Sequence, residues 1–135
     1  MPSTLPIITA SYAALLTLMY MVLSINVTRA RYRNRVSLLD GDKPDMRKNM
    51  RIHGNFSEYV PLALIVIFFV ELGGASIWTL HLLGIGLFLG RILHATGLKA
   101  QGPAGFGRKA GMYLTAAVMI SGSIWILIYI TLGIQ

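Results

Sequence analysis

Residues 5–27 form a run of 23 residues without a charged side chain. As an α-helix this run would be about 34 Å long, enough to cross a membrane hydrocarbon core of about 30 Å. It differs from a secretion signal, because no basic residue precedes it and several basic residues follow it. We therefore predict a retained membrane-spanning helix over residues 5–28.

Three further apolar segments predict membrane helices over about residues 50–71, 75–98 and 108–134. The first of these is unusual, since Tyr59–Val70 holds only 12 uncharged residues, about 18 Å of helix. To span the membrane, this helix must include residues back to about Ile52, which brings Asn55 and Glu58 to membrane depth. The chain is thus predicted to be an all-α integral membrane protein, one domain over residues 1–135 with four transmembrane helices.

The composition agrees with a lipid environment. Apolar residues make up 55% of the 135-residue chain, and the mean hydropathy is +0.64. A soluble domain of this size buries only about 65–70% of the surface that its unfolded chain exposes, too little to hide so many apolar side chains. The chain has no cysteine, which excludes disulfides, thiolate metal sites and a cysteine nucleophile. Thiol chemistry would therefore need a thiol supplied by a ligand.

The net charge of +7 could indicate nucleic-acid binding, but the distribution of the charges favours membrane orientation instead. All twelve Lys and Arg residues lie between positions 29 and 109, at the flanks of the predicted spans. They concentrate in the loops that follow the first and third spans. By the positive-inside rule, both loops lie in the cytoplasm and both termini lie outside it.

A polar stripe marks the cytoplasmic end of the second predicted span. Arg51, Asn55 and Glu58 follow the spacing i, i+4, i+7 and therefore share one helical face. Counted along antiparallel helices, Glu58 and Arg91 reach a similar depth, so an ion pair between them is sterically reasonable. Two interpretations remain open: the polar groups hold two helices together, or they line a ligand site.

An excess of cations favours the ligand site. The arginines that can approach one cytoplasmic cleft are Arg31, Arg35, Arg51, Arg91 and Arg108. The only acidic residue inside a span is Glu58, since Glu71 lies at the outer end of the same span. Guanidinium groups bind carboxylates through paired hydrogen bonds, and a buried glutamate suits an ammonium group. A small zwitterion with two carboxylates and one amine would fit such a cleft.

Four segments resemble the MAPEG family, the membrane-associated proteins in eicosanoid and glutathione metabolism. RIHGNFSEYVPL (51–62) resembles the second-helix signature of the family, above all that of its leukotriene C4 synthases, and the chain as a whole looks like its small bacterial inner-membrane members. ARYRNRVS (30–37), GRILHATG (90–97) and RKAGMY (108–113) resemble segments of the other three helices, in the same order. The matching positions are Arg31, Arg35, Arg51, Asn55, Glu58, Pro61, Arg91, His94, Arg108 and Tyr113.

The resemblance implies a homotrimer of four-helix bundles in the bacterial inner membrane, with glutathione bound between subunits near the cytoplasmic face. It also implies glutathione transferase activity, in which the glutathione thiol attacks a lipophilic electrophile. The electrophile would arrive from the lipid, in a groove between the first and fourth helices. Peroxidase activity is a variant of this function within the family. Arg108 would stabilise the thiolate as the catalytic residue.

The binding residues carried over from the family surround the remaining parts of glutathione. Arg51 and Asn55 would hold its backbone, Glu58 its amine, and Arg31 of a neighbouring first helix a carboxylate. The other positions implied to contact glutathione or to order its site are Tyr59, Arg91, His94 and Tyr113.

The chain departs from the family at Leu98, where the leukotriene and prostaglandin enzymes have a tyrosine. A binding protein without turnover therefore stays open as an alternative, as does a small multidrug-type transporter, although the first span here carries no glutamate. Lys109 is an alternative to Arg108 beside the thiol. The three histidines lack the spacing of a metal site, so no metal is expected.

Overall fold

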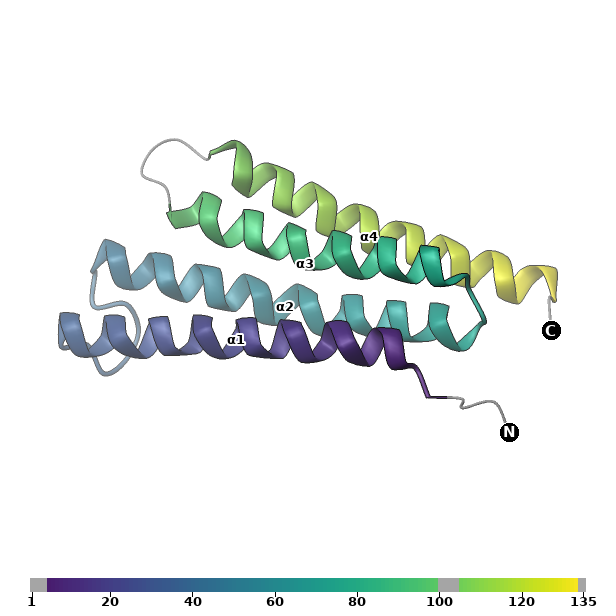
Figure 1. Ribbon diagram of the computed structural model, residues 1–135. Coiled ribbons are helices and arrows are strands. Elements are labelled where there is room, and N and C mark those ends of the chain that lie inside the picture. Colours follow the sequence, from purple (N-terminus) through teal and green to yellow (C-terminus); the bar gives the residue numbers. More distant parts are fainter. Residues whose placement is uncertain (1–4, 100–104, 134–135) are drawn as a thin grey trace.

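The computed structural model describes residues 5–99 and 105–133, and these form four long helices (Figure 1). In chain order the helices are α1 (Ile7–Asn34), α2 (Pro44–Leu72), α3 (Ile77–Lys99) and α4 (Phe106–Leu132). All four are long and apolar enough to cross a membrane, with α3 counted to Leu98. The prediction of an all-α chain with four such helices is confirmed.

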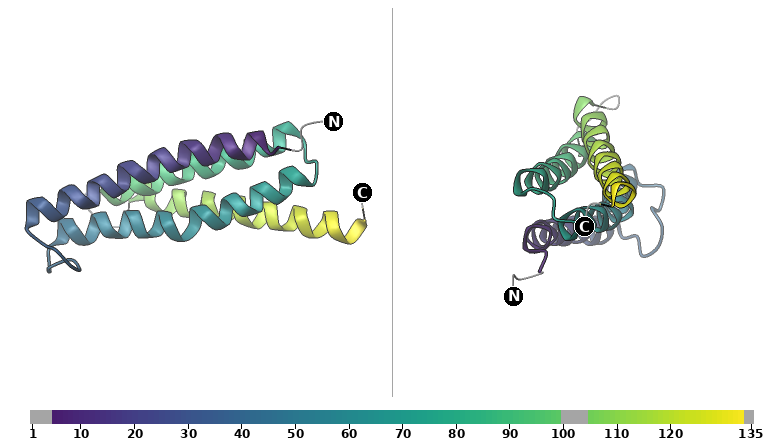
Figure 2. Two further views of the ribbon diagram at one scale, coloured as in Figure 1. Left: turned by 90° about the horizontal axis from the view of Figure 1, so that it is seen from below. Right: turned by 90° about the vertical axis from the view of Figure 1, so that its right-hand side faces the viewer.

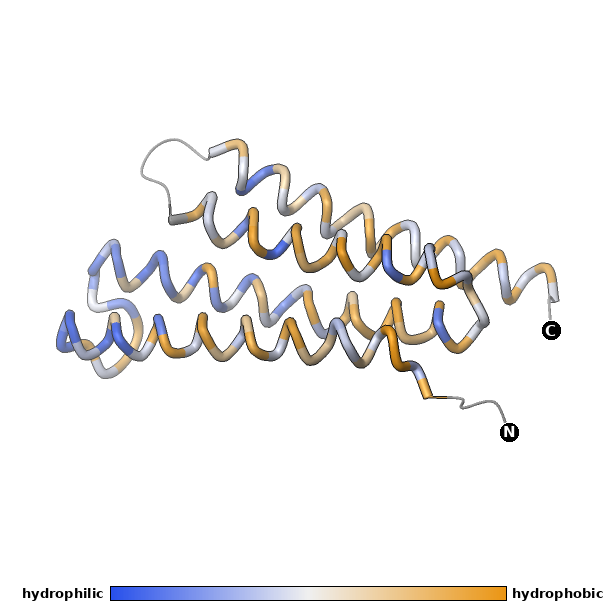
Figure 3. Tube along the Cα trace, in the orientation of Figure 1, coloured by the Kyte–Doolittle hydropathy of each residue, from blue (hydrophilic) through white to orange (hydrophobic). Residues whose placement is uncertain are grey.

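The helices form two antiparallel hairpins, α1 with α2 and α3 with α4, which pack against each other (Figure 2). Within the described part of the chain, α1 contacts α2 and α3 but makes no contact with α4. The start of α1, the end of α4 and the short α2–α3 connection lie at one end of the bundle. The opposite end carries most of the hydrophilic residues (Figure 3), and we call it the basic end.

Two helix boundaries differ from the prediction at the basic end. The first helix continues to Asn34, and the second begins at Pro44 rather than near residue 50. Residues 44–49, which precede the predicted second span, therefore belong to α2. The reason is that proline is well suited to the first helical position, where its missing N–H costs nothing. Arg35 closes the first helix in a left-handed conformation, with φ of 53°.

Close packing of α3 on α4 depends on glycine, a small residue that allows membrane helices to approach each other closely. A Cβ atom placed on Gly111 would lie 2.5 Å from the carbonyl oxygen of Gly90 and 2.5 Å from the backbone nitrogen of His94. A Cβ atom on Gly97 would lie 2.2 Å from the backbone nitrogen of Arg108. Only glycine at these two positions allows the helices to approach so closely, and this approach positions the start of α4 beside the end of α3.

At the other end of the bundle, the Glu71 carboxylate binds the start of α1. It accepts hydrogen bonds from the backbone N–H groups of Ile8 at 2.9 Å and Thr9 at 2.7 Å. These N–H groups have no partner within their own helix, and the positive end of the helix dipole favours a negative charge there. Glu71 thus joins the end of α2 to the beginning of α1. This role of Glu71 was not predicted from the sequence.

Candidate functional site

A polar cleft of about 370 Å³ opens near the basic end between α2, α3 and α4. Eight residues line it: Arg51, Asn55, Glu58, Tyr59, His94, Leu98, Arg108 and Met112. We call this feature the polar cleft. Six of these residues were predicted as site residues from the sequence.

One face of α2 supplies half of the lining. Arg51, Asn55 and Glu58 recur at intervals of four and three residues, so the helical repeat places them on one side, and Tyr59 adjoins them. Arg51 and Glu58 are exposed, whereas Asn55 and Tyr59 are half-buried. The two charged groups are therefore free to meet a ligand that enters the cleft.

The α3–α4 hairpin supplies the opposite side. His94 is only 4% exposed, and Leu98 lies one turn further along α3. Arg108 and Met112 stand one turn apart on α4, so both face the cleft. The structure thus places Arg108 in the lining, and Lys109 is not among the lining residues. Met112 was missed from the sequence, although its i+4 spacing from Arg108 could have identified it.

Arg91 lies beneath the cleft rather than in its lining. Its side chain is 1% exposed, donates a 2.8 Å hydrogen bond from Nη1 to the Asn55 Oδ1, and places its guanidinium carbon 5.8 Å from the centre of the Tyr59 ring. The other terminal nitrogen of Arg91, Nη2, lies 3.8 Å from the Met112 sulfur. Its Nε has no hydrogen-bond partner in the described part of the chain. Arg91 thereby fixes which way the Asn55 amide points.

The suggested ion pair between Glu58 and Arg91 does not form. Over residues 5–99 and 105–133, the ion pairs join Arg33 to Asp45 and Arg47 to the two aspartates of the α1–α2 loop. Arg91 donates its hydrogen bond to Asn55 instead. The Glu58 carboxylate is exposed and forms no ion pair or hydrogen bond with the described residues. The polar groups of the cleft are therefore not saturated by one another.

Two predicted site residues lie outside the cleft of their own chain. Arg31 donates hydrogen bonds of 3.2 Å from Nη1 to the carbonyl oxygens of Ser37 and Leu39, at the α1–α2 loop. Tyr113 is 74% exposed on α4 and is not among the lining residues of the polar cleft. Arg35, the remaining matched arginine, lines the same loop-side hollow as Arg31.

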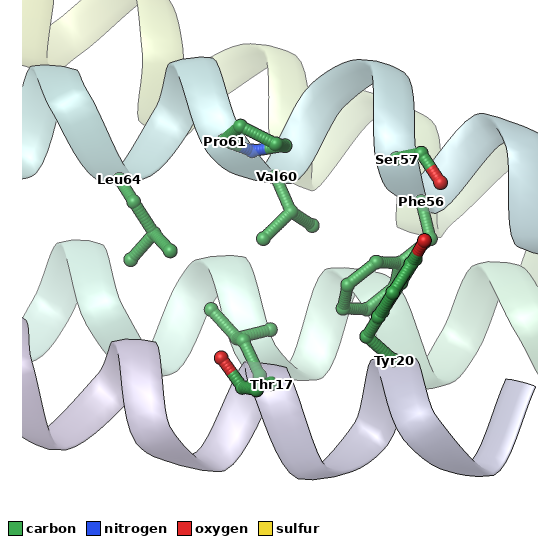
Figure 4. Close-up of a pocket in the computed structure, with 8 residues that line it drawn as sticks. Thr17, Tyr20, Phe56, Ser57, Val60, Pro61 and Leu64 are labelled. Atoms are coloured by element: carbon green, nitrogen blue, oxygen red, sulfur yellow. The ribbon is translucent and has the colours of Figure 1, made fainter. Parts of the chain in front are cut away.

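A separate apolar groove of about 290 Å³ lies between α1 and α2 (Figure 4). Thr17 and Tyr20 of α1 face Val60 and Leu64 of α2 across it, and Pro61 lies on its α2 side. An apolar groove was expected between the first and fourth helices instead. Within one chain those helices do not touch, so a groove between them would require two subunits.

Comparison with known proteins identifies the family. The model of the MAPEG family matches residues 9–128. The chain belongs to the MAPEG family. It is also 35% identical over 121 residues to the inner membrane protein YecN of Escherichia coli strain K12, an alignment that covers 87% of this chain and 91% of the relative. The YecN of Escherichia coli strain CFT073 matches equally well.

The described residues contain no group of three or more His, Asp or Glu side chains that could hold a metal ion. His53 and His81 each have partners elsewhere in the bundle. The His53 Nε2 lies 3.0 Å from the Ser24 hydroxyl, and the His81 Nδ1 lies 2.9 Å from the Tyr12 hydroxyl. His81 is thus the hydrogen-bonded packing residue that a histidine within a span most often is.

Proposed function

We propose that this protein binds glutathione in the polar cleft and activates its thiol for attack on a lipophilic electrophile, as a membrane-bound glutathione transferase. The observation that carries the proposal is the cleft itself. Two exposed arginines, a half-buried amide and an exposed glutamate without an ion-pair partner converge on one hollow. The name of the family, which includes glutathione metabolism, supports the same ligand.

The charges of the cleft complement those of glutathione. Glutathione carries two carboxylates and one ammonium group, and the cleft offers Arg51 for a carboxylate and Glu58 for the ammonium. Arginine binds carboxylates bidentately, and Glu58 is the one acidic side chain in the lining that can receive the ammonium. Asn55, oriented by Arg91, can donate its amide N–H groups to a peptide carbonyl while its oxygen accepts from Arg91.

Arg108 is the residue that we assign to thiol activation. A neighbouring cation stabilises a thiolate relative to the thiol and so lowers the thiol pKa. A drop of about two pKa units corresponds to about 2.7 kcal/mol of differential interaction. Arg108 lies at the start of α4, and the partial positive charge of that helix N-terminus acts in the same direction.

The full site requires neighbouring copies of the chain, and we propose a homotrimer in the bacterial inner membrane with both termini outside the cytoplasm. Arg31 lies at the loop side of α1, so it can reach a glutathione carboxylate only in the cleft of another subunit. The electrophile would likewise approach from lipid at a boundary between α1 and α4 of different subunits.

The direct test is conjugation of glutathione to a generic aryl halide by the purified protein in detergent. We expect Arg108→Ala to keep glutathione affinity, to lose the ultraviolet absorbance of bound thiolate, and to lower the conjugation rate at neutral pH by up to about 100-fold if the thiol pKa returns by two units. Lys109→Ala, which removes the adjacent charge outside the lining, is the matched control. Persistence of the thiolate signal in Arg108→Ala would show that another group activates the thiol.

Binding of glutathione without turnover is the second candidate, because Leu98 lines the cleft at the position where related enzymes carry a tyrosine. An apolar side chain there removes one possible hydrogen bond to the ligand. Glutathione binding without conjugate formation, and without the thiolate absorbance, would select this candidate. Leu98→Tyr should then strengthen glutathione binding.

A further inference from the structure

A second polar hollow lies at the basic end, between α1 and α2 and apart from the polar cleft. Its volume is about 390 Å³. Its lining comprises Asn26, Arg29, Arg33, Asp45, Lys48, Asn49 and Ile52, none of which lines the polar cleft. We call it the basic cavity.

The charges of the basic cavity favour an anion. Three basic side chains and one acidic side chain line it, so it carries an excess of two positive charges. Its carboxylate, that of Asp45, already accepts hydrogen bonds from Arg33, from the Asn34 amide at 3.2 Å and from the Asn49 amide at 3.3 Å. The acidic group is therefore satisfied by the protein itself and does not call for a cationic ligand.

The donors that remain are suited to a phosphate. Arg29 makes no hydrogen bond or ion pair with the described residues. Arg33 carries five N–H donors and uses one terminal nitrogen for Asp45, which leaves the others available. A guanidinium fork binds two phosphate oxygens at once, so the two arginines, one turn apart on α1, can hold a single phosphodiester between them.

The depth of the cavity matches the level of lipid headgroups. Arg29 is the first charged residue after the uncharged run of residues 5–27, so it lies where α1 leaves the hydrocarbon. On the same helical face, four apolar residues precede Arg29 by 4, 7, 11 and 14 positions. These residues, which we call the acyl stripe, are Ile25, Val22, Leu18 and Leu15, with exposed fractions of 44, 57, 66 and 47%.

The acyl stripe has the length of one lipid tail. From Ile25 to Leu15 it covers about 15 Å of helix, which equals half the thickness of a hydrocarbon core of about 30 Å. We propose that the basic cavity binds the phosphodiester headgroup of an anionic phospholipid, with one acyl chain lying along the acyl stripe. Basic pockets between transmembrane helices on the cytoplasmic side are typical sites for such headgroups. The proposal does not depend on glutathione.

Native mass spectrometry from mixed micelles tests the site, with phosphatidylglycerol and phosphatidylcholine as the probes. The wild-type protein should retain phosphatidylglycerol in preference to phosphatidylcholine. Arg29→Gln should reduce that preference about fivefold, the equivalent of about 1 kcal/mol for one basic residue at an anionic surface. Lys43→Gln is the matched control: it removes one exposed positive charge at the same end of the bundle but outside the basic cavity, and should leave the preference unchanged.

Four outcomes would overturn the proposal. Equal losses in both variants would show diffuse charge attraction, and equal retention of both lipids would show no headgroup site. Displacement of phosphatidylglycerol by inorganic phosphate at matched concentration would assign the cavity to a soluble anion. A change of oligomeric state in Arg29→Gln, together with lipid loss, would assign it to a subunit contact.

A photoactivatable group on the acyl chain of phosphatidylglycerol tests the second half of the proposal. The cross-linked peptide should contain the acyl stripe, and Arg29→Gln should reduce its labelling while labelling of α4 stays constant. Labelling spread evenly over all four helices, or unchanged in Arg29→Gln, would contradict a bound lipid at this position.

Discussion

From the close packing of α3 on α4 we predict how much Gly111→Ala lowers the stability of the protein. The added Cβ would lie 2.5 Å from two backbone atoms, of Gly90 and His94, whereas ordinary contact begins at 3.4 Å. The helices must therefore separate by about 0.9 Å, since backbone atoms cannot rotate away as a flexible side chain can. Overpacking of this kind costs about 1–3 kcal/mol. Because alanine otherwise favours a helix by about 1 kcal/mol over glycine, the net loss is up to about 2 kcal/mol.

Gly54→Ala is the matched control, because nothing lies within 4 Å of a Cβ atom at that position on α2. It should stabilise the protein by up to about 1 kcal/mol through helix propensity alone. Thermal unfolding in detergent, followed by circular dichroism, should then give a lower midpoint for Gly111→Ala and an equal or higher one for Gly54→Ala. For a chain of this size each kcal/mol shifts the midpoint by about 4 °C.

The same separation would move Arg108 and Met112 away from His94, so Gly111→Ala should also weaken glutathione binding while Gly54→Ala leaves it unchanged. Equal unfolding midpoints for the two variants would refute the reasoning, because they would mean that α3 and α4 do not approach each other at Gly111 as closely as described.

Three further predictions concern polar contacts. Arg91→Met should leave the unfolding midpoint unchanged or raise it, because it removes a buried charge that has no ion-pair partner among the described residues. The same change should weaken glutathione binding about ten- to a hundredfold, because Asn55 loses the hydrogen bond that orients it, worth about 1.5–3 kcal/mol. Equal affinity in a calorimetric titration would contradict this. Glu71→Gln should lower the free energy of unfolding by about 1 kcal/mol, because the start of α1 loses its negatively charged partner. An unchanged midpoint of thermal unfolding would be evidence that Glu71 does not stabilise α1. The hydrogen bond from Arg47 lowers the pKa of the half-buried Asp40 carboxyl. The stabilising effect of this bond on the loop is therefore present above a pH of about 4 and is lost as the pH falls through the lower, folded-state pKa. An NMR titration of Arg47→Gln should show the Asp40 pKa returning upwards, and an unmoved pKa would exclude Arg47 as the cause.

Much of the fold could be predicted because membrane helices leave strong signals in a sequence. The first helix begins within two residues of the uncharged run of residues 5–27, and α3 begins within two residues of the predicted start at residue 75. The start of the second helix at Pro44 was missed because aspartate, glycine and proline between residues 40 and 44 indicate a turn, and the same residues also suit the beginning of a helix. Local composition alone does not separate these two possibilities.

The residues of the cleft that share one face of a helix could be predicted from their spacing. The contacts that depend on how the helices pack could be predicted less well. Arg51, Asn55 and Glu58 share a face by spacing alone, and the structure places all three in one hollow. The direction of a long side chain cannot be read from depth, so the matched levels of Glu58 and Arg91 suggested an ion pair where Arg91 instead binds Asn55. Contributions from neighbouring subunits, such as the one expected of Arg31, leave no periodic signal within a single chain.

Calorimetric titration of the purified protein with glutathione tests most directly whether the polar cleft holds a charged tripeptide. The comparison ligand is an analogue that lacks the amine of the γ-glutamyl group, and the comparison protein is Glu58→Gln. We predict that the wild-type protein binds glutathione more tightly than the analogue and that Glu58→Gln binds the two alike. An absence of binding heat at millimolar glutathione would contradict the proposed ligand, and an equal preference for glutathione in Glu58→Gln would contradict the role of Glu58.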